Sequence, residues 1–252
     1  MRDILSNTEK RKLLRESYIE RIILKSSGKL WAVSSLVKES LVSDYGLPDE
    51  KVFVLYNGVD VEKYKPLDDS ERENLRKSLG LGGDKIILLF VGADIVRKGL
   101  HLVLEALKKV NKPYRYTLIT IGFNPSMELR DAVRNLDVRF LGKVPEETLI
   151  KYYQISDALV LPSYYDPFPL VTLEAMACGA IPIVSANIGA KDVIIHGING
   201  FVIRDLKDLI LVLNHIHSLD IGKLRSSAIK TAQEQSWNNI AKRLSTLLQS
   251  PG

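Results

Sequence analysis

The chain has 252 residues and is 46% hydrophobic, which is enough for one large domain, or for one domain and a fragment. Its net charge of +5 suits anionic small molecules or a membrane surface, and without an aromatic-interleaved basic patch it does not favour nucleic acid. The single cysteine, Cys178, excludes an internal disulfide and is expected to pack in the core. No apolar run reaches the roughly 18 residues of a membrane span and no signal peptide is visible, so we expect a cytoplasmic protein.

The first 56 residues predict an abbreviated N-terminal segment. Residues 1–28 have the spacing of one basic helix, which either packs on its own domain or lies on a membrane surface. A strand is predicted at 30–33, then a helix capped by Ser34 or Ser35 and ending near Tyr45, then a strand at 51–56.

From residue 57 to 235, apolar strands alternate with amphipathic helices. Strands are predicted at 86–91, 116–120, 138–141, 158–162 and 181–184, and helices at 70–79, 99–110, 126–136, 145–153 and from 169 or 170 to 179. This rhythm is typical of an α/β fold with a doubly wound, parallel, Rossmann-like sheet. The tail is helical from about residue 206, and residues 236–252 form a C-terminal helix beginning near Trp237.

Two carboxylates stand out in the segment 163–179. Asp166 and Glu174 are separated by seven residues, after a strand and across the start of a helix near Pro169 or Leu170. A helix start presents free amides and partial positive charge to a phosphate, and carboxylates accept hydrogen bonds from hydroxyls. Together they suit a sugar nucleotide, although an acid near a helix start can also merely complement the helix dipole.

The same segment resembles the signature of retaining GT-B-fold glycosyltransferases of family four. That signature reads Glu-Gly-Phe-Gly-Leu-Val, two residues, then Glu-Ala-Met-Ala-Cys-Gly, and it is matched here by Phe168, Leu170, Val171 and residues 174–179. Asp166 replaces the first Glu, and Pro169 replaces the second Gly and removes one N–H from the phosphate cradle. The resemblance implies a GT-B C-terminal, donor-binding domain carrying a short N-terminal extension of helices and strands.

The resemblance also implies roles for individual residues. Glu174 would bind the ribose, Asp166 the transferred sugar, and Arg97, Lys98 and the amides of Leu170 and Val171 the diphosphate. The remaining donor-binding positions would be Phe168, Gly92 after the strand 86–91, and Leu141 and Gly142 in the loop that reads the base through its backbone. Backbone readout leaves UDP, GDP and ADP open as the donor's nucleotide.

We therefore expect a hexosyltransferase-type enzyme that retains the anomeric configuration and uses neither a metal nor a cofactor beyond the donor substrate. The chain has no Asp-x-Asp, no GxGxxG and no P-loop, and its four histidines lack metal-ligand spacing. The acceptor would be a sugar, a lipid or a protein, and peripheral membrane contact is compatible with the basic N-terminus.

The predicted elements leave no room for a full acceptor-binding domain. An alternative is therefore a non-catalytic donor-binding subunit whose partner chain, or second copy in a homodimer, supplies that domain; a shortened sequence is another reading. A GT-B-like epimerase or phosphorylase is a weaker alternative, and the phosphorylase would need a pyridoxal-lysine motif that is not present.

Overall fold

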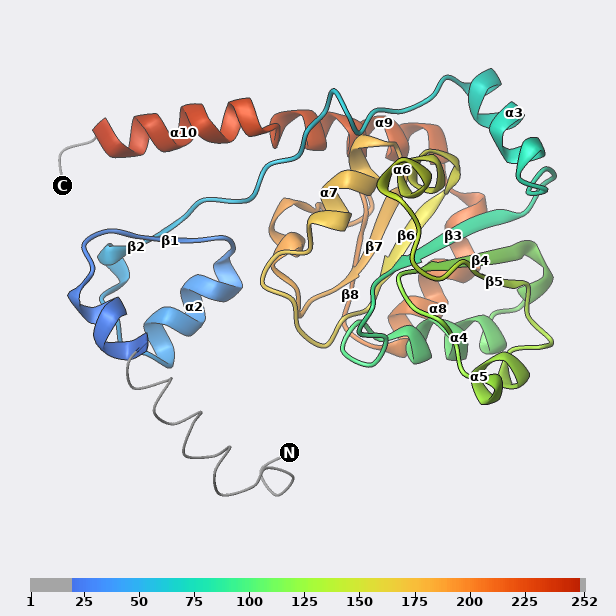
Figure 1. Ribbon diagram of the computed structural model, residues 1–252, viewed down its shortest axis with the longest axis horizontal. Coiled ribbons are helices and arrows are strands. Elements are labelled where there is room, and N and C mark those ends of the chain that lie inside the picture. Colours follow the sequence, from blue (N-terminus) through green and yellow to red (C-terminus); the bar gives the residue numbers. More distant parts are fainter. Residues whose placement is uncertain (1–19, 250–252) are drawn as a thin grey trace.

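The computed structural model describes residues 20–249, which form a small lobe and a larger main domain (Figure 1). The small lobe comprises a helical stretch at 20–26, β1 (Leu30–Ala32), α2 (Ser35–Ser43), a 3-10 turn and β2 (Val52–Val54). Strands β1 and β2 are parallel, with Leu30 opposite Val52, around a small core of Ala32, Leu47 and Val52. The rest of the predicted basic helix lies outside the described residues.

The main domain is a six-stranded sheet in the order β5-β4-β3-β6-β7-β8, in which every pairing is parallel. The predicted doubly wound α/β sheet is therefore confirmed. Its strands are β3 (Ile86–Val91), β4 (Tyr116–Ile121), β5 (Val138–Phe140), β6 (Ala158–Leu161), β7 (Ile181–Ser185) and β8 (Phe201–Ile203). Its helices are α3 (Asp69–Ser78), α4 (Leu100–Lys109), α5 (Met127–Ala132), α6 (Glu146–Ile155), α7 (Leu170–Ala177), α8 (Leu206–His215), α9 (Ile221–Glu234) and α10 (Trp237–Gln249).

Helices cover both faces of this sheet. Helices α4 and α8 pack together on one face, and α6, α7 and α9 lie on the other (Figure 1). Strands β4, β6 and β7 are buried along their whole length, as is β3 after its first residue. Burial on both faces explains why these strands read as continuous apolar runs rather than alternating ones.

The strand order reverses at β3. The chain moves outward from β3 to β4 and β5, then returns to β6 on the other side of β3 and continues to β7 and β8. In open parallel sheets, this reversal leaves a crevice beside the carboxyl ends of the two central strands, where ligands bind. The loops that follow β3 and β6 are therefore the first place to look for a site.

Two helices or strands differ from the sequence prediction by more than two residues. Residues 201–203 form β8, which pairs with β7 from Ile183 to Ser185 and was not among the predicted strands. Helix α5 ends at Ala132 rather than Leu136, because the next residues form tight turns in which the amide of Val133 reaches back to Arg130.

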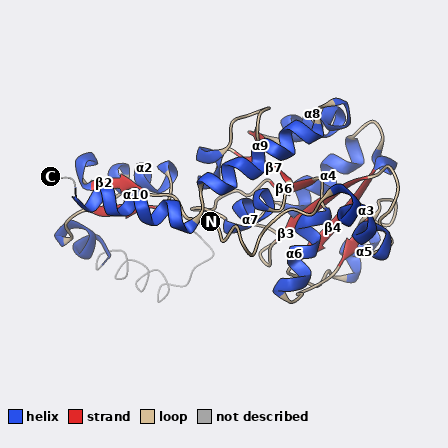
Figure 2. Cartoon of the chain, turned by 90° about the horizontal axis from the view of Figure 1, so that it is seen from above, coloured by secondary structure: helices blue, strands red, loops and turns tan. Residues whose placement is uncertain are grey.

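The two lobes are joined by paired chain segments and by side chains. The amide of Val59 donates to Gln235 and that of Trp237 donates back to Val59, so the linker after β2 runs beside the start of α10. Helix α10 then extends over the small lobe (Figure 2). Within residues 20–249 we find no helix whose length and hydropathy would let it cross a bilayer.

Candidate functional site

The loops after β3 and β6 meet at the switch point and bring Arg97, Lys98 and Asp166 together. Lys98 Nζ lies 2.5 Å and Arg97 Nη1 3.4 Å from Asp166 Oδ2. The Arg97 guanidinium also donates to the carbonyl of Tyr165 at 2.9 Å, and the amide of Tyr164 donates to the carbonyl of Arg97 at 2.8 Å. Residues almost seventy positions apart are thus held in one cluster by backbone as well as side-chain bonds.

The cluster combines a shielded ion pair with an accessible cation. The side chains of Lys98 and Asp166 are each 12% exposed, whereas Arg97 is 42% exposed. Arg97 also contacts Asp94, 3.2 Å away, and the backbone amide of Arg97 is the main reason that the pKa of Asp94 is lowered. Two adjacent cations at a helix start oppose the helix dipole, so they favour an anion at this edge.

A turn at Gly99 sets the cations against the end of β6. Gly99 has φ +75°, and a Cβ there would lie 2.3 Å from the carbonyl oxygen of Pro162. Only glycine accepts both this backbone conformation and so close an approach. The position of Lys98 relative to Asp166 therefore depends on this glycine.

The start of α7 lies next to Asp166. Phe168 is buried and stacks on Tyr56, with 6.0 Å between ring centroids, which anchors the loop before the helix. Pro169 stands at the N-cap, and the first amide bonded within the turn is that of Thr172. The amides of Leu170 and Val171 therefore belong to the unsatisfied helix start, where anions bind.

Glu174, one turn along α7, is partly buried and bonded to a residue that sequence reasoning missed. The Tyr153 hydroxyl donates to Glu174 Oε2 at 2.8 Å, and Tyr153 is completely buried. Burial raises the pKa of Glu174, and burial beside this carboxylate holds the pKa of Tyr153 well above its ordinary value. A tyrosine in the amphipathic helix α6 has no local signal that would mark it as this partner.

Three glycines line the carboxyl ends of neighbouring strands. Gly92, Gly122 and Gly142 follow β3, β4 and β5, and the amide of Gly122 donates to the carbonyl of Gly142 at 2.7 Å. A Cβ on Gly122, which has φ +115°, would lie 2.8 Å from the carbonyl carbon of Gly92. Gly122 was not predicted as a site residue, although a glycine directly after an apolar strand was a usable signal.

Leu141, beside Gly142, lies two strands away from the charged cluster. Its amide donates to the carbonyl of Thr120 at 3.0 Å, which fixes the loop after β5 against the end of β4. The predicted residues therefore divide into a charged group beside β3, β6 and α7, and a backbone-lined group beside β4 and β5. An elongated ligand would be needed to contact both groups.

The protein family follows from a match that spans most of this domain. Residues 71–235 match the model of the family described as Glycosyl transferases group 1, and residues 3–63 match the model described as Glycosyltransferase Family 4. The chain belongs to the group 1 glycosyl transferases. The glycosyltransferase family that the signature segment indicated is thereby confirmed.

Relatives and solved structures agree with this group 1 assignment. An uncharacterized glycosyltransferase of Methanocaldococcus jannaschii is 32% identical over 221 residues, which are 83% of this chain and 57% of that protein. A D-inositol 3-phosphate glycosyltransferase of Corynebacterium kroppenstedtii is 28% identical over 91% of this chain and 55% of its own length. This group 1 chain thus spans just over half the length of the curated relatives it matches.

The fold is shared with solved structures. Anabaena HepE, crystallised with UDP and glucose, superposes with a TM-score of 0.79 at 23% identity, over 93% of this chain and 66% of that one. A sucrose-phosphate synthase of Thermosynechococcus elongatus gives a TM-score of 0.77 at 26% identity, over 92% of this chain and 60% of that one. The GT-B-type fold of this group 1 domain is therefore shown.

The cysteine and the histidines of this group 1 domain make contacts that suit packing or structural roles. Cys178 is fully buried, and burial raises the pKa of its thiol to about 12. His101 bonds to Tyr164, and His196 and His215 contact backbone carbonyls. Across residues 20–249, no group of three His, Cys, Asp or Glu side chains is placed to hold a metal ion.

Proposed function

We propose that this chain binds a nucleoside-diphosphate sugar at the switch point and transfers the sugar to an acceptor with retention, without a metal or a further cofactor. The observation that carries the proposal is the meeting of Lys98, Arg97 and Asp166 with the start of α7 at one sheet edge. The ligands crystallised with Anabaena HepE, UDP and glucose, support the ligand class.

The nucleotide would lie along the strand ends. Glu174 accepts the ribose hydroxyls, since Tyr153 occupies Oε2 and a carboxylate has further lone pairs to offer. Leu141 and Gly142 contact the base through their backbone, and Gly92 lies beneath the stem of Lys98, where a Cβ would come within 3.0 Å of Lys98 Cγ.

A bound diphosphate would accept some of the hydrogen bonds that the two cations now donate to Asp166. Arg97, Lys98 and the amides of Leu170 and Val171 stabilise the negative charge that develops on the leaving phosphate, which is usually the largest catalytic contribution. Asp166 then accepts hydroxyls of the transferred sugar. The leaving phosphate oxygen takes the proton of the acceptor hydroxyl, so no protein base is required.

The alternative is a donor-binding subunit that needs a partner chain or second copy to supply the acceptor domain. It is favoured by the two departures from the family signature, at Asp166 and at Pro169. In either case the proposal includes a cytoplasmic location, with peripheral membrane contact where the acceptor is a lipid.

Calorimetric titration with UDP, GDP and ADP in metal-free buffer tests the proposal. We expect saturable binding of one diphosphate, and a loss of about tenfold or more in affinity for Glu174→Gln, equivalent to about 1.4 kcal/mol. Glu147→Gln, an exposed acid on α6, serves as the matched control. Equal affinity in Glu174→Gln would remove the ribose role.

Incubation of the chain alone with UDP-glucose distinguishes a complete transferase from a non-catalytic donor-binding subunit. Release of UDP that depends on an added acceptor supports transfer by this chain. Binding without release under any acceptor condition supports the subunit, and release without acceptor indicates hydrolysis or epimerisation instead.

A further inference from the structure

Asp166 binds the same two cations that are proposed to hold the diphosphate. Lys98 Nζ lies 2.5 Å and Arg97 Nη1 3.4 Å from one oxygen, Oδ2 of Asp166. A carboxylate oxygen and a phosphate oxygen are both anionic acceptors, and both form charge-assisted hydrogen bonds with lysine and arginine. The carboxylate of the protein itself therefore competes with a diphosphate for these donors.

The two cations differ in how far they depend on Asp166. Arg97 has two further partners, the Asp94 carboxylate at 3.2 Å and the Tyr165 carbonyl at 2.9 Å. For the Lys98 ammonium, Asp166 is the only hydrogen-bond acceptor found within residues 20–249. The side chains of Lys98 and Asp166 are both 12% exposed, so solvent screens this pair less than it screens Arg97. Competition with a diphosphate should therefore centre on Lys98.

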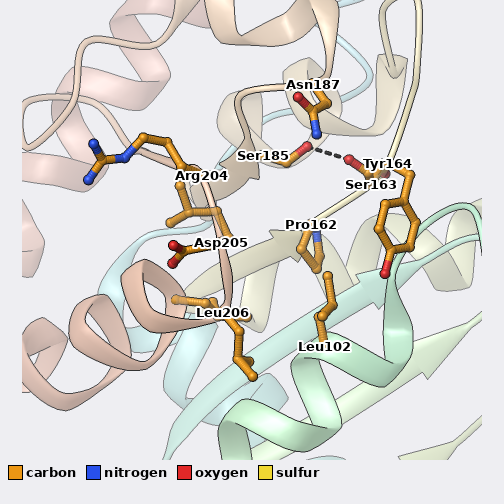
Figure 3. A pocket seen from close by; sticks show the side chains of 11 residues that line it. Leu102, Pro162, Ser163, Tyr164, Ser185, Asn187, Arg204, Asp205 and Leu206 are labelled. Carbon is orange, nitrogen blue, oxygen red and sulfur yellow. Dashed lines mark hydrogen bonds between the residues drawn. The ribbon is translucent and has the colours of Figure 1, made fainter.

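The loop before Asp166 is bonded to neighbouring segments. The hydroxyl of Ser185 donates to the carbonyl of Ser163 at the wall of a pocket that adjoins this loop (Figure 3). The amide of Tyr164 donates to the carbonyl of Arg97 at 2.8 Å. These bonds hold the loop against β7 on one side and against the segment that carries the two cations on the other.

The loop after Asp166 is bonded as well. The amide of Gly189 donates to the carbonyl of Asp166 at 2.9 Å, and the hydroxyl of Ser34 donates to the carbonyl of Pro167 at 2.8 Å. With its backbone held on both sides, Asp166 stays in place when a cation moves toward a ligand. A Lys98 ammonium drawn to a diphosphate would then leave a largely buried carboxylate without its closest partner, which is unfavourable.

A sugar attached to the diphosphate would remove this disadvantage. The sugar hydroxyls can donate to the Asp166 carboxylate in place of the lysine, whereas a nucleoside diphosphate without a sugar brings no donor to that oxygen. Asp166 should therefore act against the diphosphate product more than against the intact nucleotide sugar.

We propose that Asp166 competes with the diphosphate for Lys98 and thereby weakens the binding of the nucleoside diphosphate relative to that of the nucleotide sugar. The inference rests on the proposed function and adds to the same site a means of favouring product release. UDP carries more negative charge than UDP-glucose at neutral pH, so the prediction concerns the change in the ratio of the two affinities rather than their order.

Calorimetry on the full chain with pyrophosphate, UDP and UDP-glucose in metal-free buffer tests this inference. Asp166→Asn keeps the shape of the side chain but removes its charge, so we expect pyrophosphate and UDP to bind at least fivefold more tightly. The affinity for UDP-glucose should stay unchanged or fall, because an amide is a poorer acceptor for sugar hydroxyls than a carboxylate. Asp166→Ser, a smaller neutral variant, should show the same pattern.

Asp94→Asn is the matched control, because it removes the same charge from a carboxylate bonded to Arg97 and leaves Lys98 paired. The inference would be overturned by unchanged affinities for pyrophosphate and UDP in both Asp166 variants, by an equal gain for UDP-glucose, or by the same gain in Asp94→Asn. If pyrophosphate binding improves in Asp166→Asn while neither uridine nucleotide binds to any of the proteins, a uridine donor is refuted and the competition for Lys98 stands.

Discussion

At the scale of single residues, Glu174 combines burial with a polar partner. Burial raises its pKa, so in the folded protein it takes up a proton at a higher pH than an exposed glutamate does. The Tyr153 hydroxyl opposes this shift by stabilising the carboxylate. Any ligand group that donates a hydrogen bond to this carboxylate should therefore shift the pKa of Glu174.

We expect the affinity for UDP to fall as the pH is lowered through the raised pKa of Glu174, because ribose hydroxyls bind the ionised carboxylate better than the protonated one. Binding then releases a proton in the acidic range, since the ligand pulls the raised pKa of Glu174 down again. Calorimetry in two buffers of different ionisation enthalpy measures both effects. The terminal phosphate of UDP also titrates, at about pH 6, so Glu174→Gln should reduce the pH dependence to the part that the phosphate causes. An identical pH profile in that variant would show that Glu174 makes no contribution.

Tyr153→Phe should weaken UDP binding about fivefold, corresponding to about 1 kcal/mol for one lost hydrogen bond to the carboxylate. Loss of this donor also raises the pKa of Glu174 further, so the acidic loss of affinity moves to higher pH. Tyr152→Phe, one residue earlier in α6, is the control. Equal affinities for the two variants would show that Tyr153 has only a packing role.

At the scale of elements, glycines fix the loops that carry the site. Gly99, before α4, and Gly122, after β4, both have positive φ and lie against backbone atoms of adjacent loops. Each can be replaced only by moving the loop that carries it, because the neighbouring atom is main chain rather than a flexible side chain. Substitution therefore tests whether these loops need their present positions.

Gly99→Ala should lower both stability, by more than about 1 kcal/mol, and affinity for UDP, since the Cβ would lie 2.3 Å from the Pro162 carbonyl oxygen. Gly197→Ala is a close control: its φ is +76° and no atom lies within 4 Å of an added Cβ. Denaturant unfolding and calorimetry measure the two effects. If the positive φ were the only source of strain, the two variants would lose equal stability and neither would lose affinity.

The sequence alone was sufficient to predict strands that are buried on both faces of the sheet. Strands β3, β4, β6 and β7 are buried on both faces, so an apolar run alone identifies them, and the signature segment identifies α7. β8 escaped prediction because three residues carry too little pattern and its pairing with β7 is a tertiary property.

The sequence was not sufficient for contacts between distant residues. The pairing of Lys98 with Asp166 and of Tyr153 with Glu174 depends on how β3, β6, α6 and α7 are arranged in space. A motif can indicate that such residues share a site, but it does not show which side chains form ion pairs or hydrogen bonds with each other.

At the scale of the whole molecule, the small lobe is attached to the loop that carries Asp166. Asp192 accepts both the amide and the hydroxyl of Ser35 at 2.7 Å, at the start of α2. Ser34 donates to the carbonyl of Pro167 at 2.8 Å, and a Cβ on Gly189 would lie 1.9 Å from that same oxygen. A change in the position of the small lobe should therefore move the loop that carries Asp166.

Asp192→Asn should loosen the small lobe by about 1–2 kcal/mol, because it removes a carboxylate that satisfies the first turn of α2. Hydrogen exchange should quicken in α2, β1 and β2 and stay unchanged in β3 and β4. Asp49→Asn is the control, since that exposed acid pairs with Lys38 in the same lobe. Uniform acceleration across both lobes would show that they unfold as one unit.

The paired crossing at Val59 and Ser236 has a mechanical consequence. Two chain segments pass between the lobes side by side, joined by backbone hydrogen bonds on both sides of Ser236. The contacts of Ser34 with Pro167 and of Ser35 with Asp192 form a second, separate attachment. Because the small lobe is held at two places, the loss of either attachment alone would leave it joined to the main domain by the other.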